Sequence, residues 1–251
     1  MKLDDTRRNW HALGKQDPLL AILTYKEKRG GKWEINEFFE TGVREVRATF
    51  NYLRGLGINL KGGRALDFGC GVGRLTQALV PRFEETVGVD IASSMINLAN
   101  RYNRYPEKCD YLVNTADNLR LFPEKSFDFI FSKITLQHVE PRYAKNYIRE
   151  FLRLAKPEGI ILFQLPTESV GEAEASPLLR SRVKTLLPSF VLATYYRVKH
   201  HFSPMLEMYG VPHDEVLAIV AEGNGKVIDS RENQDSGEKW RSFSYVAVKN
   251  S

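Results

Sequence analysis

From Arg64 onward, short apolar runs alternate with longer amphipathic segments, and this alternation constrains the fold more than any other feature of the chain. Strands that alternate with helices in this way predict an α/β fold, with a parallel sheet covered by helices on both faces. The segments 225–233 and 242–250 follow one another without a helix between them, so we expect them to pair antiparallel. The other expected strands are RALDF, ETVGVD, DYLVN, FDFIFS and IILFQLP, and the expected helices between them are GRLTQALV, SSMINLANRYNR and YAKNYIREFLRLAK.

A long amphipathic helix precedes the alternating region. In residues 36–56, Phe39, Val46 and Leu53 recur at the spacing of one helix face. Asn36 stands where an N-cap is expected, because its short side chain can accept a hydrogen bond from the first turn. We therefore predict a helix that begins at Asn36 and packs on the sheet through its apolar face.

The chain divides into a helical extension and one main domain. We expect residues 1–62 to form the extension over the ligand site, and residues 63–251 to form the α/β domain. The strand and helix alternation is interrupted at 167–210, which we interpret as an inserted helical lid. Within it, residues 175–206 contain five Lys or Arg and no acid, a surplus as large as the net charge of +5 of the whole chain.

Composition excludes several classes of protein. The chain is 43% hydrophobic and 27% charged, which is typical of a soluble globular protein, and it contains no apolar run of membrane-spanning length. The first residues lack the apolar region of a secretory signal, so we expect a cytoplasmic protein. Cys70 and Cys109 are too few for a disulfide framework, and no spacing of Cys and His predicts a metal site.

A glycine-rich turn, ALDFGCGVGR, follows the first expected strand. Gly69, Gly71 and Gly73 alternate strictly, and Arg74 stands where a dinucleotide fingerprint needs its third glycine. The G-K-[ST] ending of a phosphate-binding P-loop is absent as well. Asp90 ends the next strand, 21 residues after Gly69, and an acid at that place can accept hydrogen bonds from both hydroxyls of a ribose.

Residues 64–165 resemble the core of the class I S-adenosylmethionine-dependent methyltransferases. The resemblance rests on ALDFGCGVGR, VGVDIASSM, NTADNLRLFPEKSFDFIFSKITLQHV and LRLAKPEGIILFQLP, taken in this order and at suitable spacing. It implies a Rossmann-like sheet of seven strands, mostly parallel, with an antiparallel strand near the C-terminus. It also implies S-adenosylmethionine as the cofactor.

The same resemblance implies which residues bind the cofactor. The glycines would let the backbone approach its methionine and ribose parts, Asp90 would bind the ribose hydroxyls, and Asp67 would support the turn and face the amino group. Residues expected around the adenine and the methionine moiety are Cys70, Ile91, Met95, Asp117, Asn118 and Ser132. Each also has a plain structural interpretation, Cys70 as a small packed residue and Asp117 as a turn residue for example.

The side of the site that would hold the methyl acceptor is less defined. A base is needed only if the acceptor must lose a proton, and His138 is the best-placed candidate for that role. Trp10 and Trp33 of the N-terminal extension are candidates for lining the acceptor cleft, or for anchoring helices to the core. Tyr195 and Tyr196 are candidates from the lid.

The charge of the lid window has three interpretations. The basic segment 175–206 attracts an acidic acceptor, or it contacts an anionic membrane surface as a peripheral protein would. The third interpretation is that the segment forms a solvated helix pair that only closes the site. Nucleic acid is a poor fit, because no recognised binding motif accompanies the charge. The chain also has SKIT where methyltransferases of nucleic-acid amino groups commonly carry N/D-P-P-Y/F.

We therefore predict methyl transfer from S-adenosylmethionine to oxygen or nitrogen of a small molecule, sugar or glycan. Placing the acceptor in line with the methyl group would supply much of the acceleration. One alternative is an NAD(P)-dependent oxidoreductase, which the spacing of the glycine turn disfavours. The other is a methyltransferase-like binding subunit without catalysis. The oligomeric state is not indicated by the sequence.

Overall fold

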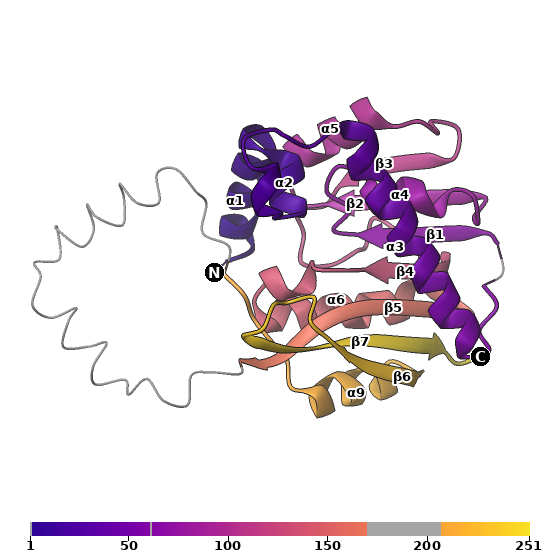
Figure 1. Ribbon diagram of the computed structural model, residues 1–251. Helices are drawn as coiled ribbons and strands as arrows, with labels where there is room; N and C mark the ends of the chain where they lie inside the picture. The colour runs from indigo at the N-terminus through magenta and orange to yellow at the C-terminus, as the bar shows by residue number, and fades with distance from the viewer. Residues whose placement is uncertain (1, 61, 170–206) are drawn as a thin grey trace, which may run out of the picture.

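A computed structural model of the chain describes residues 2–60, 62–169 and 207–251. Seven strands form one sheet in the order β3-β2-β1-β4-β5-β7-β6 (Figure 1). The pairs among β1 to β5 are parallel, whereas β7 is antiparallel to both β5 and β6. The predicted α/β fold, with its C-terminal antiparallel pair, is confirmed. The strands are β1 Arg64–Phe68, β2 Glu85–Asp90, β3 Cys109–Val113, β4 Phe127–Ser132, β5 Ala155–Ser169, β6 Gly225–Asn233 and β7 Trp240–Lys249.

The helices lie on both faces of this sheet. Buried residues of α3 and α4 pack against one face, together with Phe129 and Leu162, while α6 and α9 pack against the other, together with Leu66 and Phe163. Apolar side chains alternate in direction along each strand, so both faces are buried and the core has two layers. The helical elements are α1 Leu3–Gln16, α2 Pro18–Ile22, η1 Lys26–Lys28, α3 Ile35–Gly55, α4 Arg74–Leu79, α5 Ser93–Tyr102, η2 Leu136–His138, α6 Pro141–Leu154 and α9 His213–Glu222.

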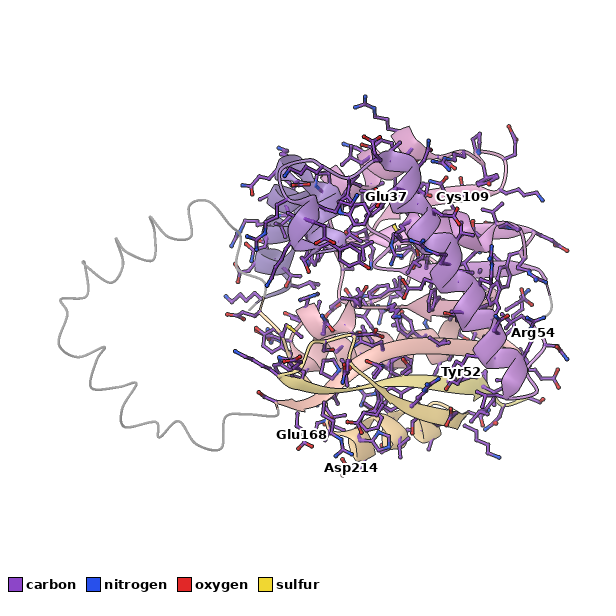
Figure 2. The ribbon with its side chains drawn as sticks, viewed as in Figure 1. Glu37, Tyr52, Arg54, Cys109, Glu168 and Asp214 are labelled. Carbon is purple, nitrogen blue, oxygen red and sulfur yellow. The ribbon has the colours of Figure 1, made fainter. Side chains whose placement is uncertain are left out.

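The long helix α3 begins two residues earlier than the predicted N-cap implies. Its N-cap is Glu34, and Asn36 lies inside the first turn, where its side-chain oxygen accepts a hydrogen bond from Arg104 at 2.8 Å. The expected cap is therefore wrong, because a tertiary contact engages the side chain that capping would have required. At the other end of α3, the hydroxyl of Tyr52 donates to Asp229 of β6 at 2.5 Å (Figure 2).

The first two helices lie over the carboxyl ends of β1 and β2. The hydroxyl of Ser94 in α5 donates to the carbonyl of His11 at 2.9 Å, and a Cβ on Gly14 would lie 2.4 Å from that hydroxyl. The close approach of α1 to α5 thus depends on a glycine. Most of the lid predicted at 167–210 falls outside the described residues, and its first three positions belong to β5. Among the described helices, none is both long and apolar enough to cross a bilayer.

Candidate active site

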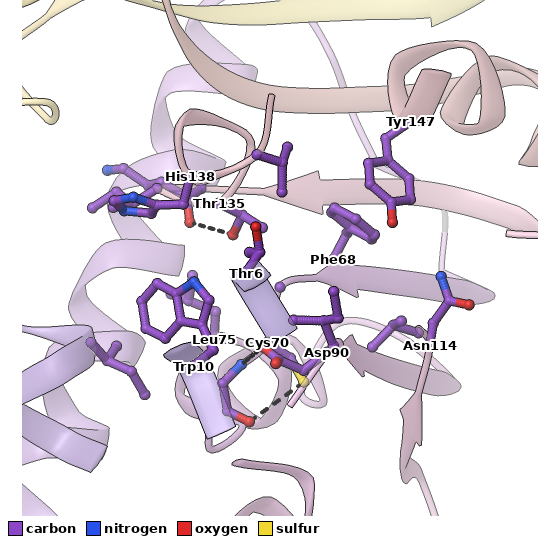
Figure 3. A pocket seen from close by; sticks show the side chains of 18 of the residues that line it. Thr6, Trp10, Phe68, Cys70, Leu75, Asp90, Asn114, Thr135, His138 and Tyr147 are labelled. Carbon is purple, nitrogen blue, oxygen red and sulfur yellow. Dashed lines mark hydrogen bonds between the residues drawn. The ribbon is translucent and has the colours of Figure 1, made fainter. Parts of the chain in front are cut away.

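A pocket opens where β1, β2 and β4 end, beneath α1 and α2 (Figure 3). In open α/β sheets, the carboxyl ends of the strands are where ligands bind. The empty space, counted together with the open solvent at its mouth, measures about 990 Å³. The residues that line it are Leu3, Thr6, Trp10, Ala21, Ile22, Phe68, Gly69, Cys70, Gly71, Arg74, Leu75, Val89, Asp90, Ile91, Asn114, Lys133, Ile134, Thr135, His138, Val139 and Tyr147.

The glycine turn requires glycine for two physical reasons. Gly69, Gly71 and Gly73 all have left-handed backbone, with φ of 79°, 54° and 84°. Added Cβ atoms would also lie 2.2 Å from the side chain of Thr135 at Gly69 and 2.7 Å from Ile22 at Gly71. Gly69 and Gly71 line the pocket, whereas Gly73 caps α4 outside the lining.

The backbone amides of this turn are engaged within the protein. The N–H groups of Gly69 and Cys70 donate to the carbonyl of Val89 at 2.7 and 3.1 Å, and that of Gly71 donates to Asp90 at 2.9 Å. A phosphate-binding loop needs such amides free to point at the anion. These three amides are therefore unavailable to a phosphate, in agreement with the sequence, which favours neither a dinucleotide fingerprint nor a P-loop.

Asp90 ends β2 and holds the turn from the side. One carboxylate oxygen accepts from Gly71, and the other accepts from the N–H of Ala92 at 2.8 Å. Each oxygen has two lone pairs, so one lone pair on each is left for a ligand in the pocket. Burial raises the pKa of this carboxyl, and the backbone hydrogen bonds oppose that shift.

Asp67 lies behind the turn, outside the pocket lining. Its carboxylate accepts from the hydroxyl of Thr76 in α4 at 2.7 Å, which ties the end of β1 to that helix. Burial raises the pKa of Asp67 to about 6, although the hydrogen bond from Thr76 lowers it. Asp67 therefore lies where it can support the turn but does not line the pocket, and its predicted contact with the amino group of the cofactor stays a prediction.

Asn114 lines the pocket and was not predicted from the sequence. It directly follows the last residue of β3, next to the strand that Asp90 ends, and its amide donates to the carbonyls of Ala116 at 3.3 Å and Asn118 at 2.8 Å. Its place as the polar residue directly after a strand was the available signal. Asp117 and Asn118 lie beside it but outside the lining, hydrogen-bonded to each other at 3.1 Å.

The remaining expected residues divide into two groups. Cys70, Ile91 and Trp10 line the pocket together with the residues above. Ser132 is fully buried beneath it, and its hydroxyl donates to the carbonyl of Phe68 at 3.1 Å. Outside the lining, Met95 and Trp33 share a buried cluster with Phe38. Tyr195 and Tyr196 lie outside the described residues.

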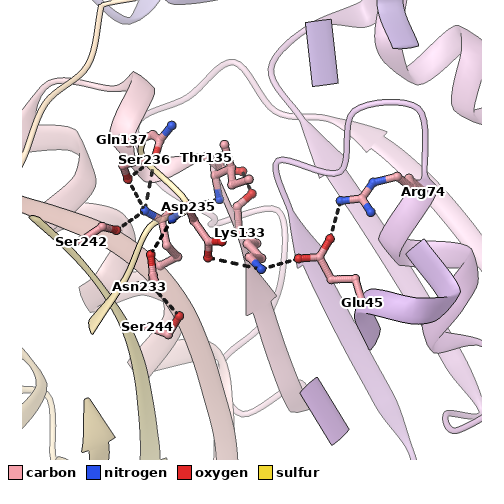
Figure 4. Close-up of polar contacts among 12 residues, drawn as sticks. Glu45, Arg74, Lys133, Thr135, Gln137, Asn233, Asp235, Ser236, Ser242 and Ser244 are labelled. Atoms are coloured by element: carbon pink, nitrogen blue, oxygen red, sulfur yellow. Dashed lines mark hydrogen bonds and ion pairs between the residues drawn. The ribbon is translucent and has the colours of Figure 1, made fainter. Parts of the chain in front are cut away.

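A row of alternating charges borders the pocket (Figure 4). Glu45 of α3 pairs with Arg74 at 2.9 Å and also with Lys133, and Lys133 pairs with Asp235 at 3.3 Å. Although burial opposes both shifts, Lys133 and Arg74 hold the pKa of Glu45 below its usual value, and Glu45 raises that of Lys133. These pairs join α3, the start of α4, the segment after β4 and the β6–β7 connection.

His138 lines the pocket beside Trp10. The two rings meet edge to face, with centroids 5.5 Å apart and planes at 68° (Figure 3). Burial lowers the pKa of His138, and a hydrogen bond to the carbonyl of Glu207 raises it. The structure therefore places the base candidate in the pocket, and its role as a base stays a prediction.

Comparison with known proteins finds methyltransferases that are similar to this chain. A family model described as a methyltransferase domain matches residues 66–163. Malonyl-[acyl-carrier protein] O-methyltransferase of Yersinia pestis is 29% identical over 75% of this chain and 70% of its own length. Phosphoethanolamine N-methyltransferase of Triticum aestivum is 27% identical over 78% of this chain, which spans only 34% of that protein.

A solved structure extends the likeness across the whole fold. Magnesium protoporphyrin IX methyltransferase from Synechocystis PCC 6803, with bound SAH, superposes with a TM-score of 0.61 over 97% of this chain and 98% of its own, at 17% identity. The chain carries a class I S-adenosylmethionine-dependent methyltransferase domain. Its cofactor is S-adenosylmethionine, and the resemblance inferred from the motifs is confirmed.

The pocket of this methyltransferase fits that cofactor on chemical grounds. An adenosyl group needs apolar surface and an acceptor for the ribose hydroxyls, and the pocket supplies Ile91 and Val89 beside Asp90. The sulfonium carries no phosphate, which suits a turn whose amides are engaged by Asp90 and Val89. Among the described residues, no group of three or more His, Cys, Asp or Glu could hold a metal ion.

Proposed function

We propose that this methyltransferase transfers the methyl group to oxygen or nitrogen of a small molecule, sugar or glycan that bears an acidic group. The observation that supports the proposal is the pocket itself, in which Asp90 lies beside the glycine turn and Trp10 and His138 form an aromatic pair. The acidic group is supported by the relatives, since two of them are named for malonyl and phosphoethanolamine acceptors.

We assign the cofactor contacts as follows. Asp90 accepts from the ribose hydroxyls through its two remaining lone pairs, and Ile91 packs on the adenine. Gly69 and Gly71 let the backbone approach the methionine part, because a side chain at either would fill that space. Asn114 stands at the rim where the adenine amino group would lie.

The chain's own contribution to the reaction is then orientation. The bound sulfonium supplies both the methyl group and its leaving group, so the enzyme must place the acceptor atom in line with them. Trp10, Thr135 and His138 form the wall that would position the acceptor. The aromatic pair of Trp10 and His138 offers a rigid apolar surface that excludes water from that side.

Mass spectrometry of a metabolite extract tests this proposal. Purified enzyme is incubated with the extract and with S-adenosylmethionine carrying a deuterated methyl group, and labelled products are sought. We expect a labelled small molecule with a carboxylate or phosphate, and no label when Asp90→Asn replaces the wild-type enzyme. Label found only in protein or nucleic acid, with none in any small molecule, would refute the proposal.

A thermal-shift series provides an independent check on the ligand. S-adenosylhomocysteine should raise the melting temperature of the wild-type protein, because a ligand that binds only the folded state stabilises it. NAD and ATP should leave it unchanged, since both need phosphate contacts that the turn does not offer. Stabilisation by NAD and not by S-adenosylhomocysteine would contradict the assigned contacts.

A further inference from the structure

A chain of side-chain hydrogen bonds runs beneath the pocket from Ile134 to Glu207. The N–H of Ile134 donates to the side-chain oxygen of Gln164 at 3.0 Å. The two hydrogens of the Gln164 amide are shared among three acceptors, Ser242 at 2.6 Å, Ser236 at 2.8 Å and the oxygen of Gln137 at 3.2 Å. Gln137 Nε2 lies 3.2 Å from Nε2 of His138, whose Nδ1 lies 3.2 Å from the carbonyl of Glu207. Gln164, Gln137 and His138 are all buried.

The direction of every bond in this chain is fixed by its two ends. A backbone N–H can only donate, so the Gln164 oxygen faces Ile134 and its amide nitrogen must donate onward. A backbone carbonyl can only accept, so Nδ1 of His138 carries the proton. The Gln137 oxygen also accepts from Ser236 at 2.8 Å, which leaves its amide nitrogen as the donor to Nε2 of His138.

Ile134 is held in an unfavourable backbone conformation at the pocket wall. Its φ is 55°, in the left-handed region that β-branched residues rarely adopt. Such a conformation persists only where surrounding contacts enforce it. The bond from its N–H to Gln164 is the contact that reaches it from the core, and Gln164 is itself fixed by Ser242 at 2.6 Å.

We propose that Gln164 is a positioning residue of this methyltransferase, which holds Ile134 in its left-handed conformation and, through Gln137, fixes His138 as the neutral Nδ1–H tautomer. Gln164 touches no part of the pocket itself, and it acts on two residues that line it. For its effect on ligand binding, the inference rests on the proposed cofactor site.

This arrangement gives His138 a positioning function in place of proton abstraction. The lone pair on Nε2 of His138 already accepts a hydrogen bond from the Gln137 amide. This nitrogen is therefore not free to take a proton from the methyl acceptor. Gln137 cannot turn over without losing its bonds to Gln164 and Ser236. His138 instead presents a fixed neutral ring to Trp10 and binds the backbone at Glu207.

Nitrogen NMR of the wild-type protein tests the tautomer without any ligand. In protein labelled with ¹⁵N-histidine at pH 7.5, His138 should show a protonated Nδ1 and an unprotonated Nε2, assigned by the loss of its signals in His138→Gln. In Gln137→Glu, the new carboxylate should draw a proton onto Nε2, so that both nitrogens become protonated. A protonated Nε2 with an unprotonated Nδ1 in the wild type would overturn the proposal.

A double-mutant cycle tests whether Gln164 maintains the left-handed backbone conformation of Ile134. Gln164→Met keeps the length of the side chain and removes its hydrogen bonds, and we expect S-adenosylhomocysteine to bind about tenfold more weakly by calorimetry. Glycine adopts positive φ without strain, so in an Ile134→Gly background the same substitution should cost less than threefold. Gln234→Met, at an exposed position in the β6–β7 connection, is the matched control and should bind as the wild type does.

The outcomes separate this inference from the proposed function. If the wild-type protein does not bind S-adenosylhomocysteine, the cofactor assignment fails. The positioning role fails, while the cofactor site stands, if the wild type and a folded Gln164→Met bind S-adenosylhomocysteine equally well. It also fails if Gln164→Met lowers the affinity as much in the Ile134→Gly background as in the wild type. The tautomer measurement uses the wild-type chain, so instability of a variant leaves it intact.

Discussion

Asp90 accepts a hydrogen bond from the N–H of Gly71 at 2.9 Å, so the carboxylate that we assign to the ribose also holds the glycine turn in place. Two consecutive strands of the sheet are thereby joined at the point where the ligand would lie. The same carboxylate fixes Ala92 at the start of α5. Substitutions at Asp90 must therefore be chosen to keep a hydrogen-bond acceptor.

Asp90→Asn should lower the affinity for S-adenosylhomocysteine at least a hundredfold. The amide keeps one acceptor oxygen for the turn, but its NH₂ group cannot accept from a ribose hydroxyl. Calorimetric titration measures the effect, and circular dichroism checks the fold. Asp110→Asn, at an exposed position on β3, provides the control and should bind normally. An Asp90→Asn protein with wild-type affinity would remove the ribose assignment.

Stability should fall as pH rises through the range in which Asp67 titrates. The unfolded carboxyl loses its proton near pH 3.8 and the folded one near pH 6, so between them the folded state binds more protons. The linked loss is about 2 kcal/mol between pH 4 and pH 7. Asp67→Asn removes this contribution and keeps an acceptor for Thr76.

Urea unfolding of both proteins at several pH values isolates that effect. The difference in unfolding free energy between Asp67→Asn and the wild type should shift in favour of the variant as pH rises from 4 to 7. Asp110→Asn should show no such trend relative to the wild type. Parallel stability curves for Asp67→Asn and the wild type would show that this carboxyl titrates normally.

Glu45→Gln should destabilise the protein by roughly 3 kcal/mol, the lower end of the range for breaking a buried ion pair. The substitution leaves Arg74 and Lys133 facing one another without the intervening carboxylate. Because the pKa of Glu45 is lowered, its contribution is present at neutral pH and is lost as pH falls below the usual range of a glutamate. Glu40→Gln, exposed on the same helix, should change stability by no more than about 0.5 kcal/mol in urea unfolding.

Gly69→Ala and Gly55→Ala should have opposite effects. At Gly69 the backbone is left-handed and the new Cβ would meet Thr135, so we expect a loss of at least about 2 kcal/mol. Gly55 lies in the last turn of α3 with nothing within 4 Å of its Cβ, and alanine there should stabilise by about 0.4–1 kcal/mol. Thermal unfolding compares the two, and equal effects would contradict the steric argument.

Local patterns predicted the fold and part of the site. The alternation of apolar runs predicted all seven strands. The glycine turn, followed by an acid at the end of the next strand, predicted that Gly69 and Asp90 line one site, and both residues line the pocket. Such features depend on residues near one another in the chain, or on strand ends that a parallel sheet brings to one edge. Asn114 lies at such an end as well, but a single polar residue there gives a weak signal.

Features that depend on distant segments were not predictable in this way. Gln164 looks like an interruption of an apolar strand, and its partners Gln137, Ser236 and Ser242 come from three other elements. The N-cap of α3 was misplaced for the same reason, since Arg104 lies far along the chain from Asn36. Sequence spacing does not specify which polar side chains meet inside a core.

The placement of β7 between β5 and β6 bears on how the protein is made. Ser242 of β7 fixes Gln164, and Ser236 just before that strand fixes Gln137, so part of the polar support beneath the pocket is translated after β1 to β5. A ribosome-bound chain can assemble β1 to β4 early, yet it lacks these two serines until residues 236 and 242 have been translated. We therefore expect a chain that ends before residue 236 to keep the glycine turn and Asp90 but to lack the hydrogen bonds that the two serines make to Gln164 and Gln137.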